Sequence, residues 1–310
     1  MSFEIPSSFV KQFSSNVYHL SQQKDSRVFS LFTRKETIQG EEKYFDRIGT
    51  VEAMEKIGRH SNTTYQDTPY SRRRISMRDY FWADLVDKQD KLRIIHNPES
   101  EYALAARAAM ARKMDDIGIA ALLGTVYTGK NGATPLSLPN AQKIAAIDGS
   151  GFSQMNIETL RQIKFKFDEN EVDDMSRHII CGAAEIRALL REDKLTNADY
   201  AAVKALVNGE VNTFMGFNFH RIERLPYTVG STQIDATTGE VGVGGDSAAA
   251  GSKRCIAFCS SAMIAGVGEN PTARVSELPE KHYSNQVYFS MSLGAMRMEE
   301  VKVIEILTKQ

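Results

Sequence analysis

The stretch from Gly124 to Asn131, GTVYTGKN, matches the GxxxxGK pattern of phosphate-binding loops. In such a loop, backbone N–H groups hold the phosphates of a nucleotide and the lysine, here Lys130, reaches the terminal phosphates. Two features count against this chemistry. Asn131 has no hydroxyl group for Mg²⁺, and the stretch follows a predicted helix, whereas a phosphate-binding loop follows a strand. We interpret it as the loop that ends a helix, and a nucleotide-binding enzyme is the less favoured alternative.

The other residue types that could do chemistry are not arranged for it. The six histidines are scattered, with no pair at metal-ligand spacing. The three cysteines lack CxxC spacing, so we expect reduced, buried thiols. The GVGGD stretch (242–246) lacks the strand and the third glycine of a dinucleotide-binding motif. For Asp115 and Asp116 we expect ion pairs with arginines. The sequence therefore predicts no catalytic residue, no cofactor and no metal.

Charged and aromatic residues are concentrated between Asp67 and Lys91. On a strand, Arg72 and Arg74 would face one way and Arg73 the other, so the arginine row would not form one patch. The formal net charge of the chain is −1, whereas proteins that bind DNA through its phosphates carry a basic excess. A DNA-binding protein is therefore a disfavoured alternative, and we predict a protein interface, where Arg, Tyr and Trp are enriched. The predicted contact residues are Arg72, Arg73, Arg74, Arg78, Trp82, Asp84, Asp87 and Asp90.

Several elements must position these residues. Residues 37–96 alternate in short apolar pieces around a turn-rich tip, HSNTTYQDTPY, which predicts a projecting hairpin of long strands. From 98 to 123 the sequence predicts a long helix, with Asn97 as N-cap, Pro98 at its first position and Gly124 after its end. The expected buried stripe is Ala103, Ala106, Met110, Met114, Ile117 and Ala121.

The flanking segments have a different character. At the N-terminus, four apolar residues recur at helical spacing: Phe9, Phe13, Val17 and Leu20. They could form an amphipathic arm that docks on another surface, although this segment alone favours an ordinary first helix packed on its own domain. After residue 150 strands and helices mix, including a helix capped by Asn156 and strands around Gly216. Near the C-terminus apolar residues alternate up to Leu293 and change parity at Gly294, which predicts a bent strand with a bulge.

The composition is that of a globular protein, with 310 residues, 42% of them hydrophobic and 25% charged. The N-terminus shows no signal-peptide pattern. Apolar stretches are interrupted by charge well before the ~18 residues that a membrane span requires. We therefore expect no membrane association.

The order of these parts resembles the tailed-bacteriophage major capsid proteins of the Hong Kong 97-like fold. Three stretches carry the resemblance: DLVDKQDKLRIIHNPESEYALAARAAMARKMDDIGIAALLG, FMGFNFHRIERLP, and VYFSMSLGAMRMEEVKVIEI with its Gly-Ala-x-Arg. The resemblance covers nearly the whole chain. It implies an α+β fold with an N-terminal arm, an extended β-hairpin loop, a long spine helix, a peripheral domain and an α/β axial domain.

The resemblance also implies domain boundaries. These are the N-terminal arm (1–36), the extended loop (37–96), the spine helix and peripheral domain (97–149), the axial domain (150–280), the long peripheral strand (281–298) and the return strand to the axial domain (299–310). The arm and the extended loop would lie over neighbouring subunits. The alternating charges around Arg72 would then pair with the neighbour and set its register.

The function implied by the resemblance is that of a shell subunit and not of an enzyme. Such subunits self-assemble into hexamers and pentamers that form an icosahedral head around double-stranded DNA, which lies close to the shell without specific contacts. The implied partners are other copies of the chain, a separate scaffolding protein, a portal and a decoration protein. The implied location is the virion, after assembly in the host bacterial cytoplasm. An encapsulin-like shell around protein cargo is the alternative with the same fold.

Overall fold

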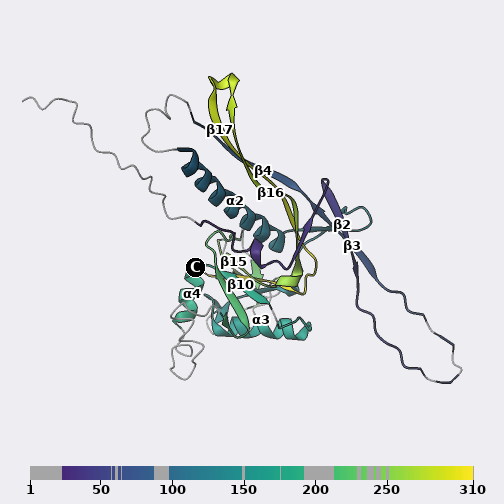
Figure 1. Ribbon diagram of the computed structural model, residues 1–310. Helices are drawn as coiled ribbons and strands as arrows, with labels where there is room; N and C mark the ends of the chain where they lie inside the picture. Colours follow the sequence, from purple (N-terminus) through teal and green to yellow (C-terminus); the bar gives the residue numbers. More distant parts are fainter. Residues whose placement is uncertain are drawn as a thin grey trace, which may run out of the picture. The chain divides into compact units, whose positions relative to one another are not determined.

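A computed structural model describes residues 23–56, 58–59, 62–63, 65–86, 98–148, 151–174, 176–191, 213–228, 232–235, 241, 246–248 and 251–309 (Figure 1). Its helices are α2 (Pro98–Leu123), α3 (Ile157–Glu169) and α4 (Ala183–Leu190). Its strands are β1 (Arg34–Thr37), β2 (Glu42–Ile48), β3 (Tyr70–Ser76), β4 (Arg78–Val86), β5 (Val126–Thr128), β6 (Thr134–Leu136), β7 (Lys143–Ala145), β8 (Ile147–Asp148), β9 (Gly151–Phe152), β10 (Arg177–Cys181), β11 (Thr213–Phe214), β12 (Phe217–Arg221), β13 (Thr232–Ile234), β14 (Asp246–Ala248), β15 (Lys253–Cys259), β16 (Met263–Leu278), β17 (Ser284–Arg297) and β18 (Val303–Thr308).

The chain forms two compact units. One contains Met1–Ser26, Asp79–Lys113 and Glu269–Ser292, and the other contains Arg27–Arg78, Met114–Gly268 and Leu293–Gln310. The chain passes between the units after Ser26 and within β4, α2, β16 and β17, because each of these four elements contributes residues to both.

A six-stranded mixed sheet forms the main core of the second unit, in the order β11-β12-β10-β15-β18-β7. Its central strands are almost entirely buried, and every residue of β18 is. Strands buried on both faces are expected to be rich in apolar residues; β15 and β18 are so except for Lys253 and Arg254 at the start of β15 and Glu305 and Thr308 in β18. Helix α3 begins as predicted at Asn156, whose side chain accepts a hydrogen bond from the backbone N–H of Thr159 at 2.8 Å.

The predicted hairpin is present but shorter than expected. Strands β2 and β3 pair antiparallel, from Glu42 opposite Ser76 to Ile48 opposite Tyr70, in a sheet of order β2-β3-β5-β6. Strand β4 follows β3 directly, yet it joins a different sheet, of order β1-β16-β17-β4. The alternating pattern from Arg72 to Val86 thus covers two consecutive strands that belong to different sheets. Apolar residues alternate with polar ones in the same way in two consecutive strands as in one long strand, so the pattern cannot distinguish them.

Helix α2 has the predicted bounds, and the backbone N–H of Gly124 closes its last turn on the carbonyl of Ala120 at 2.8 Å. The predicted stripe is only partly right. Ala106 and Met110 are buried, whereas Met114, Ile117 and Ala121 are half-buried; Asn97 and the side chain of Ala103 lie outside the described residues. The buried positions of the C-terminal half are Ala111, Asp115, Gly118, Ile119 and Leu122. Alanines of α2 lie on several of its faces, so hydrophobicity alone does not predict which face is buried.

Strand β17 shows the predicted change of phase. Buried residues alternate from Val287 to Leu293, and Gly294 and Met296 continue the pattern on the other parity. A Cβ atom at Gly294 would lie 2.5 Å from the carbonyl oxygen of Ser76, so glycine allows a close approach to the end of β3. The three cysteines are buried and form no disulfide, as predicted. None of the described helices is long and apolar enough to cross a membrane.

Candidate assembly surface

The outer face of β3 carries two exposed ion pairs with β2. Arg72 binds Asp46 through Nε and Oδ1 at 2.6 Å and through Nη2 and Oδ2 at 3.3 Å. Arg74 binds Glu42 through Nη1 and Oε1 at 2.8 Å and lies 5.0 Å from the ring centroid of Tyr127. The hydrogen bond from Arg72 lowers the pKa of Asp46 below its usual range. Antiparallel pairing therefore places alternating charges of both signs on one accessible face.

Arg73 points to the opposite face, as the alternation predicts. Its side chain is buried, with 1% exposure, and makes a bidentate ion pair with Glu300 at 2.6 and 2.7 Å. Its Nη1 also donates to the carbonyl of Arg297 at 3.1 Å. This burial removes Arg73 from the set of residues we expect at a subunit contact, because its guanidinium is enclosed within its own subunit.

Glu300 and Arg297 tie the end of α2 to the C-terminal strands. Arg297 is fully buried, and its Nη1 donates to the carbonyls of Leu122 and Gly124 at 2.5 and 3.1 Å. A cation at this position is favourable for the negative end of the helix dipole. Burial lowers the pKa of Arg297. Burial alone would raise the pKa of Glu300, but the hydrogen bonds from Arg73 outweigh this effect, so the pKa of Glu300 is lowered. The sequence signal for this contact is a single arginine between two methionines at the end of β17.

Strand β4 carries the remaining predicted contact residues that are described. Arg78 is exposed, Trp82 is half-buried against Phe289 with ring centroids 6.5 Å apart, and Asp84 accepts a hydrogen bond from the backbone N–H of Leu85 at 2.8 Å. The other predicted residues lie outside the described part of the chain: Asp87, Asp90, Phe9, Phe13, Val17 and Leu20. One contact candidate that sequence reasoning missed is Phe81, which is 71% exposed.

Large apolar side chains are exposed on and around the β2–β3 hairpin. They are Ile48, Val51, Met54, Tyr65 and Tyr70, each more than half exposed. Isolated exposed apolar residues are ordinary, but several within one projecting segment are typical of a protein contact. The hairpin therefore combines paired charges with apolar side chains that its own subunit does not cover.

The GTVYTGKN stretch does not form a phosphate-binding loop. Its residues 126–128 form β5, the backbone N–H of Gly132 bonds the carbonyl of Gly129 at 3.0 Å, and β6 follows. Lys130 is exposed in this turn between two strands. The prediction of a loop after the helix is thus right up to Thr125 and wrong for β5. Of the GVGGD stretch, only its last residue is described.

Asp115 and Asp116 have different partners. Asp116 makes the predicted ion pair, with Arg224, at 2.9 and 2.5 Å. Asp115 is buried and instead accepts hydrogen bonds from the backbone N–H groups of Arg27 and Val28 at 2.9–3.0 Å. It therefore fixes the point at which the N-terminal segment enters the second unit, a role that no sequence pattern indicates.

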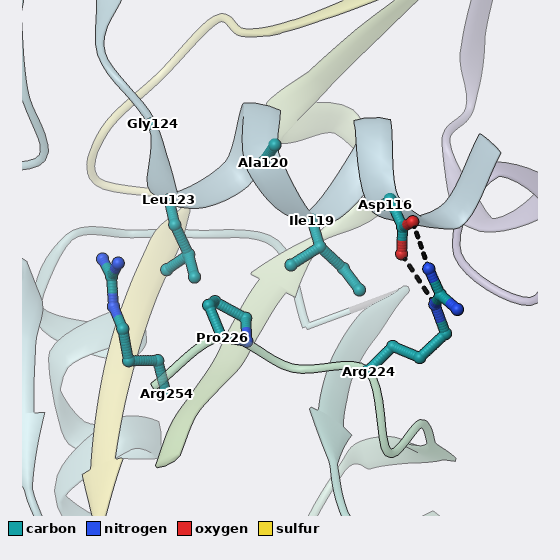
Figure 2. A pocket seen from close by; sticks show the side chains of 8 residues that line it. All are labelled: Asp116, Ile119, Ala120, Leu123, Gly124, Arg224, Pro226 and Arg254. Atoms are coloured by element: carbon teal, nitrogen blue, oxygen red, sulfur yellow. Dashed lines mark hydrogen bonds and ion pairs between the residues drawn. The ribbon is translucent and has the colours of Figure 1, made fainter. Parts of the chain in front are cut away.

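A groove of about 340 Å³ runs along the C-terminal half of α2 (Figure 2). We call it the α2 groove; its lining residues are Asp116, Ile119, Ala120, Leu123, Gly124, Arg224, Pro226 and Arg254. Figure 2 shows Ile119 and Leu123 facing Pro226, with the Asp116–Arg224 pair at one end and Arg254 at the other. Arg254 is bonded to Glu305 through Nε and Oε1 at 2.5 Å. The groove thus has an apolar floor, and the arginine at each of its ends is neutralised by a carboxylate.

Two histidines far apart in sequence meet on neighbouring strands. Nδ1 of His178 and Nε2 of His220 are 3.0 Å apart, and Nε2 of His178 is 2.8 Å from Oγ of Ser260. Burial lowers the pKa of both, that of His178 to about 4. The parallel pairing of β10 with β12 brings them together, which spacing along the chain could not reveal. Among the described residues, no group of three or more His, Cys, Asp or Glu side chains is arranged to hold a metal ion.

Comparisons with known proteins agree on one family. A family model described as "Phage capsid protein" matches residues 5–310. The capsid structure of cyanophage P-SCSP1u matches with a TM-score of 0.74 at 16% identity, covering 98% of this chain and 94% of that one. The capsid of Ralstonia phage GP4 matches with a TM-score of 0.70 at 12% identity, covering 99% and 97%. The acid-stable capsid of Helicobacter pylori bacteriophage KHP30 has a TM-score of 0.70 at 10% identity, covering 99% and 98%.

A search of curated proteins finds no match. The structural matches have low identity and so establish the fold, the mixed α+β fold of phage capsids with its long helix and extended strands. The family model covers nearly the entire sequence. The chain belongs to the phage capsid protein family.

Proposed function

We propose that this chain is the major capsid protein of a tailed bacteriophage and that its copies form the pentamers and hexamers of an icosahedral head. The observation that carries the proposal is the match of residues 5–310 to the phage capsid family, together with a capsid fold over almost the full chain. The role is structural and not enzymatic. The position of Lys130 in a turn between two strands offers no support for nucleotide chemistry.

The contact between subunits is assigned to the hairpin face and β4. Arg72 and Arg74 with their acidic partners, Arg78, Trp82 and Asp84 supply the charged and aromatic part, and the exposed apolar residues of the hairpin supply the rest. Asp87 and Asp90 belong to the same proposed surface. Charges of both signs on one face favour one register of a neighbour over others, since complementary charge gives specificity more than affinity. Weak contacts repeated around a shell add through multivalency.

The remaining roles follow from the place of the chain in a head. The N-terminal arm (1–36) would dock on a neighbouring subunit through Phe9, Phe13, Val17 and Leu20. The partners would be a separate scaffolding protein, a portal and a decoration protein, with assembly in the host cytoplasm. Packaged DNA would lie near the shell without specific contacts, in keeping with a net charge of −1.

The experiment that tests this function is nuclease protection in purified particles. Particles collected from phage-producing cells and containing this chain as their main protein should protect double-stranded DNA from added nuclease. Particles of this chain that contain protein cargo and no protected DNA would identify an encapsulin-like shell instead. The absence of the chain from particles of any kind would reject a shell function.

A further inference from the structure

Strand pairing in the second unit brings two imidazole rings within reach of one ion. In the six-stranded sheet, β10 and β12 run parallel, with His178 opposite Asn218 and Ile180 opposite His220. Side chains alternate between the faces of a sheet, so His178 and His220 extend from the same face. Nδ1 of His178 lies 3.0 Å from Nε2 of His220. Both side chains are half-buried, so solvent reaches the pair.

The separation of these two nitrogen atoms fits two neighbouring ligand positions on a transition-metal ion. Imidazole nitrogens bind such ions at about 2.0–2.1 Å, so two of them lie about 2.9 Å apart at a right angle and about 3.3 Å apart at the tetrahedral angle. The observed 3.0 Å is closer to the right angle. Neighbouring ligands meet at that angle in the square-planar and tetragonal nitrogen sites that Cu²⁺ and Ni²⁺ prefer. The rings are tilted by 48°, and rotation about the outer side-chain torsion, which is broad in histidine, aims both lone pairs at the ion.

A third side chain holds one of the two rings in place. Nε2 of His178 is 2.8 Å from Oγ of Ser260, which is buried. The backbone of Ser260 is itself fixed, because its N–H donates to the carbonyl of Ser176 at 3.0 Å and its carbonyl accepts from the N–H of Thr33 at 3.3 Å. When Oγ accepts the proton on Nε2, Nδ1 of His178 keeps its lone pair on the side of His220. Metal-binding histidines almost always have such a partner on their second nitrogen.

We propose that His178 and His220 bind one divalent transition-metal ion of the Cu²⁺ or Ni²⁺ class, with Ser260 as a positioning residue and water in the remaining ligand positions. Without the ion, an N–H···N hydrogen bond joins the two rings. With the ion, Nδ1 of His178 and Nε2 of His220 both bind the metal, and the proton on Nε2 of His220 moves to its Nδ1, so no proton is gained or lost. The ion then links β10 to β12. The inference goes beyond the proposed function, since a shell subunit does not require a metal.

Calorimetric titration of the full chain with Ni²⁺ at neutral pH tests this site. The protein carries no polyhistidine tag and is first treated with a chelator; its three cysteines are buried. We expect one ion per chain, and at least tenfold weaker binding in His178→Gln and in His220→Gln. The control His282→Gln removes an exposed histidine between β16 and β17 and should leave the affinity unchanged. No binding by the unmodified chain, or equal affinity in His178→Gln, would overturn the inference.

Electron paramagnetic resonance with Cu²⁺ gives a readout that does not require a folded variant. The unmodified chain with one equivalent of Cu²⁺ should show splitting from two imidazole nitrogens. A spectrum with one nitrogen or with none would place the ion elsewhere and overturn the inference. Ser260→Ala should keep the two-nitrogen spectrum and weaken binding ten- to a hundredfold, the usual effect of removing the partner of a metal-binding histidine. Unchanged affinity in Ser260→Ala would overturn the positioning role of Ser260.

Thermal unfolding provides a third readout. The two histidines are 42 residues apart in the sequence, so only the folded sheet holds them together, and an ion that binds the folded state alone stabilises it. Ni²⁺ should therefore raise the midpoint of unfolding of the unmodified chain, and a chelator should reverse the shift. His178→Gln should show no such shift. A shift of equal size in that variant would contradict binding by the histidine pair.

Discussion

At the residue scale, three consecutive arginines on β3 make contacts of different kinds. Arg72 and Arg74 are accessible and pair with carboxylates on the neighbouring strand, so solvent screens their interactions. Arg73 is enclosed, and in the described part of the chain Glu300 and one backbone carbonyl replace the water that it would lose on burial. An enclosed ion pair is costly to break because the remaining charge stays buried without its partner.

Removal of the Glu300 carboxylate should therefore destabilise the subunit strongly. We expect Glu300→Gln to lower the free energy of unfolding by about 3–5 kcal/mol, the range measured when one partner of a buried pair is removed. Asp46→Asn, which breaks the exposed pair with Arg72, should have a much smaller effect. Urea unfolding of both variants checks this. Similar losses in the two variants would contradict the assignment of Arg73 to the interior.

The histidine pair predicts a dependence of stability on pH. In the unfolded chain the pKa of a histidine is about 6.5, whereas burial lowers the pKa of folded His178 to about 4 and also lowers that of His220. Between these pH values the unfolded state binds more protons, so stability should fall as the pH decreases from about 6.5 toward 4. Unfolding measured across this range should show a smaller slope for His178→Gln. An unchanged slope in His178→Gln would contradict a contribution of the buried histidine pair.

At the element scale, the spine helix α2 acts as a support for segments from other parts of the chain. Arg297 bonds its last carbonyls, Asp115 holds the backbone at Arg27 and Val28, and the Asp116–Arg224 pair joins it to the segment after β12. These contacts explain why a helix with apolar residues on several sides carries two adjacent aspartates. One fixes an incoming segment, and the other closes an end of the α2 groove.

The two aspartates offer a matched pair of substitutions. Asp115→Ala leaves two backbone N–H groups without their charged acceptor, and hydrogen bonds to charged groups contribute about 1.5–3 kcal/mol. We expect a loss of stability in that range and faster hydrogen exchange at residues 27–32. Asp116→Ala, which removes a partly exposed pair, should leave exchange at 27–32 unchanged. Equal exchange in the two variants would show that Asp115 does not hold the segment.

The elements differ in how far the sequence predicts them. Capping residues and alternation are local signals, so the bounds of α2, the start of α3 and the phase change at Gly294 could be predicted. The buried face of α2 could not, because alanines leave several faces equally apolar. The opposite orientation of Arg73 was predictable from alternation on a strand, but its partner Glu300 lies 227 residues further along the chain. The His178–His220 pair depends in the same way on strand pairing.

At the scale of the whole molecule, the chain presents surfaces that its own fold does not use. The hairpin face exposes alternating charges and apolar side chains, and the α2 groove exposes an apolar floor. A net charge of −1 leaves little overall repulsion between copies. These features suit a protein whose stable state is an assembly of many copies.

Exchanging the charges of one ion pair tests the hairpin surface without breaking the pair. The double variant Arg72→Asp with Asp46→Arg keeps an ion pair within the subunit but reverses the pattern presented to a neighbour. We expect a folded subunit with particle yield reduced at least tenfold. A control exchange on α3, Arg161→Glu with Glu158→Arg, alters another exposed ion pair and should not affect yield. Normal assembly of the first variant would exclude the Arg72–Asp46 pair from subunit contacts.

Copies of this chain should build a closed shell by themselves or with head proteins of the same phage. Particle size can be followed by light scattering over a concentration series, with electron microscopy of the same fractions. We predict five- or six-membered rings, tubes or closed shells whose proportion rises with concentration. A monomer at every concentration, also with crowding agents and a scaffolding protein added, would contradict the account.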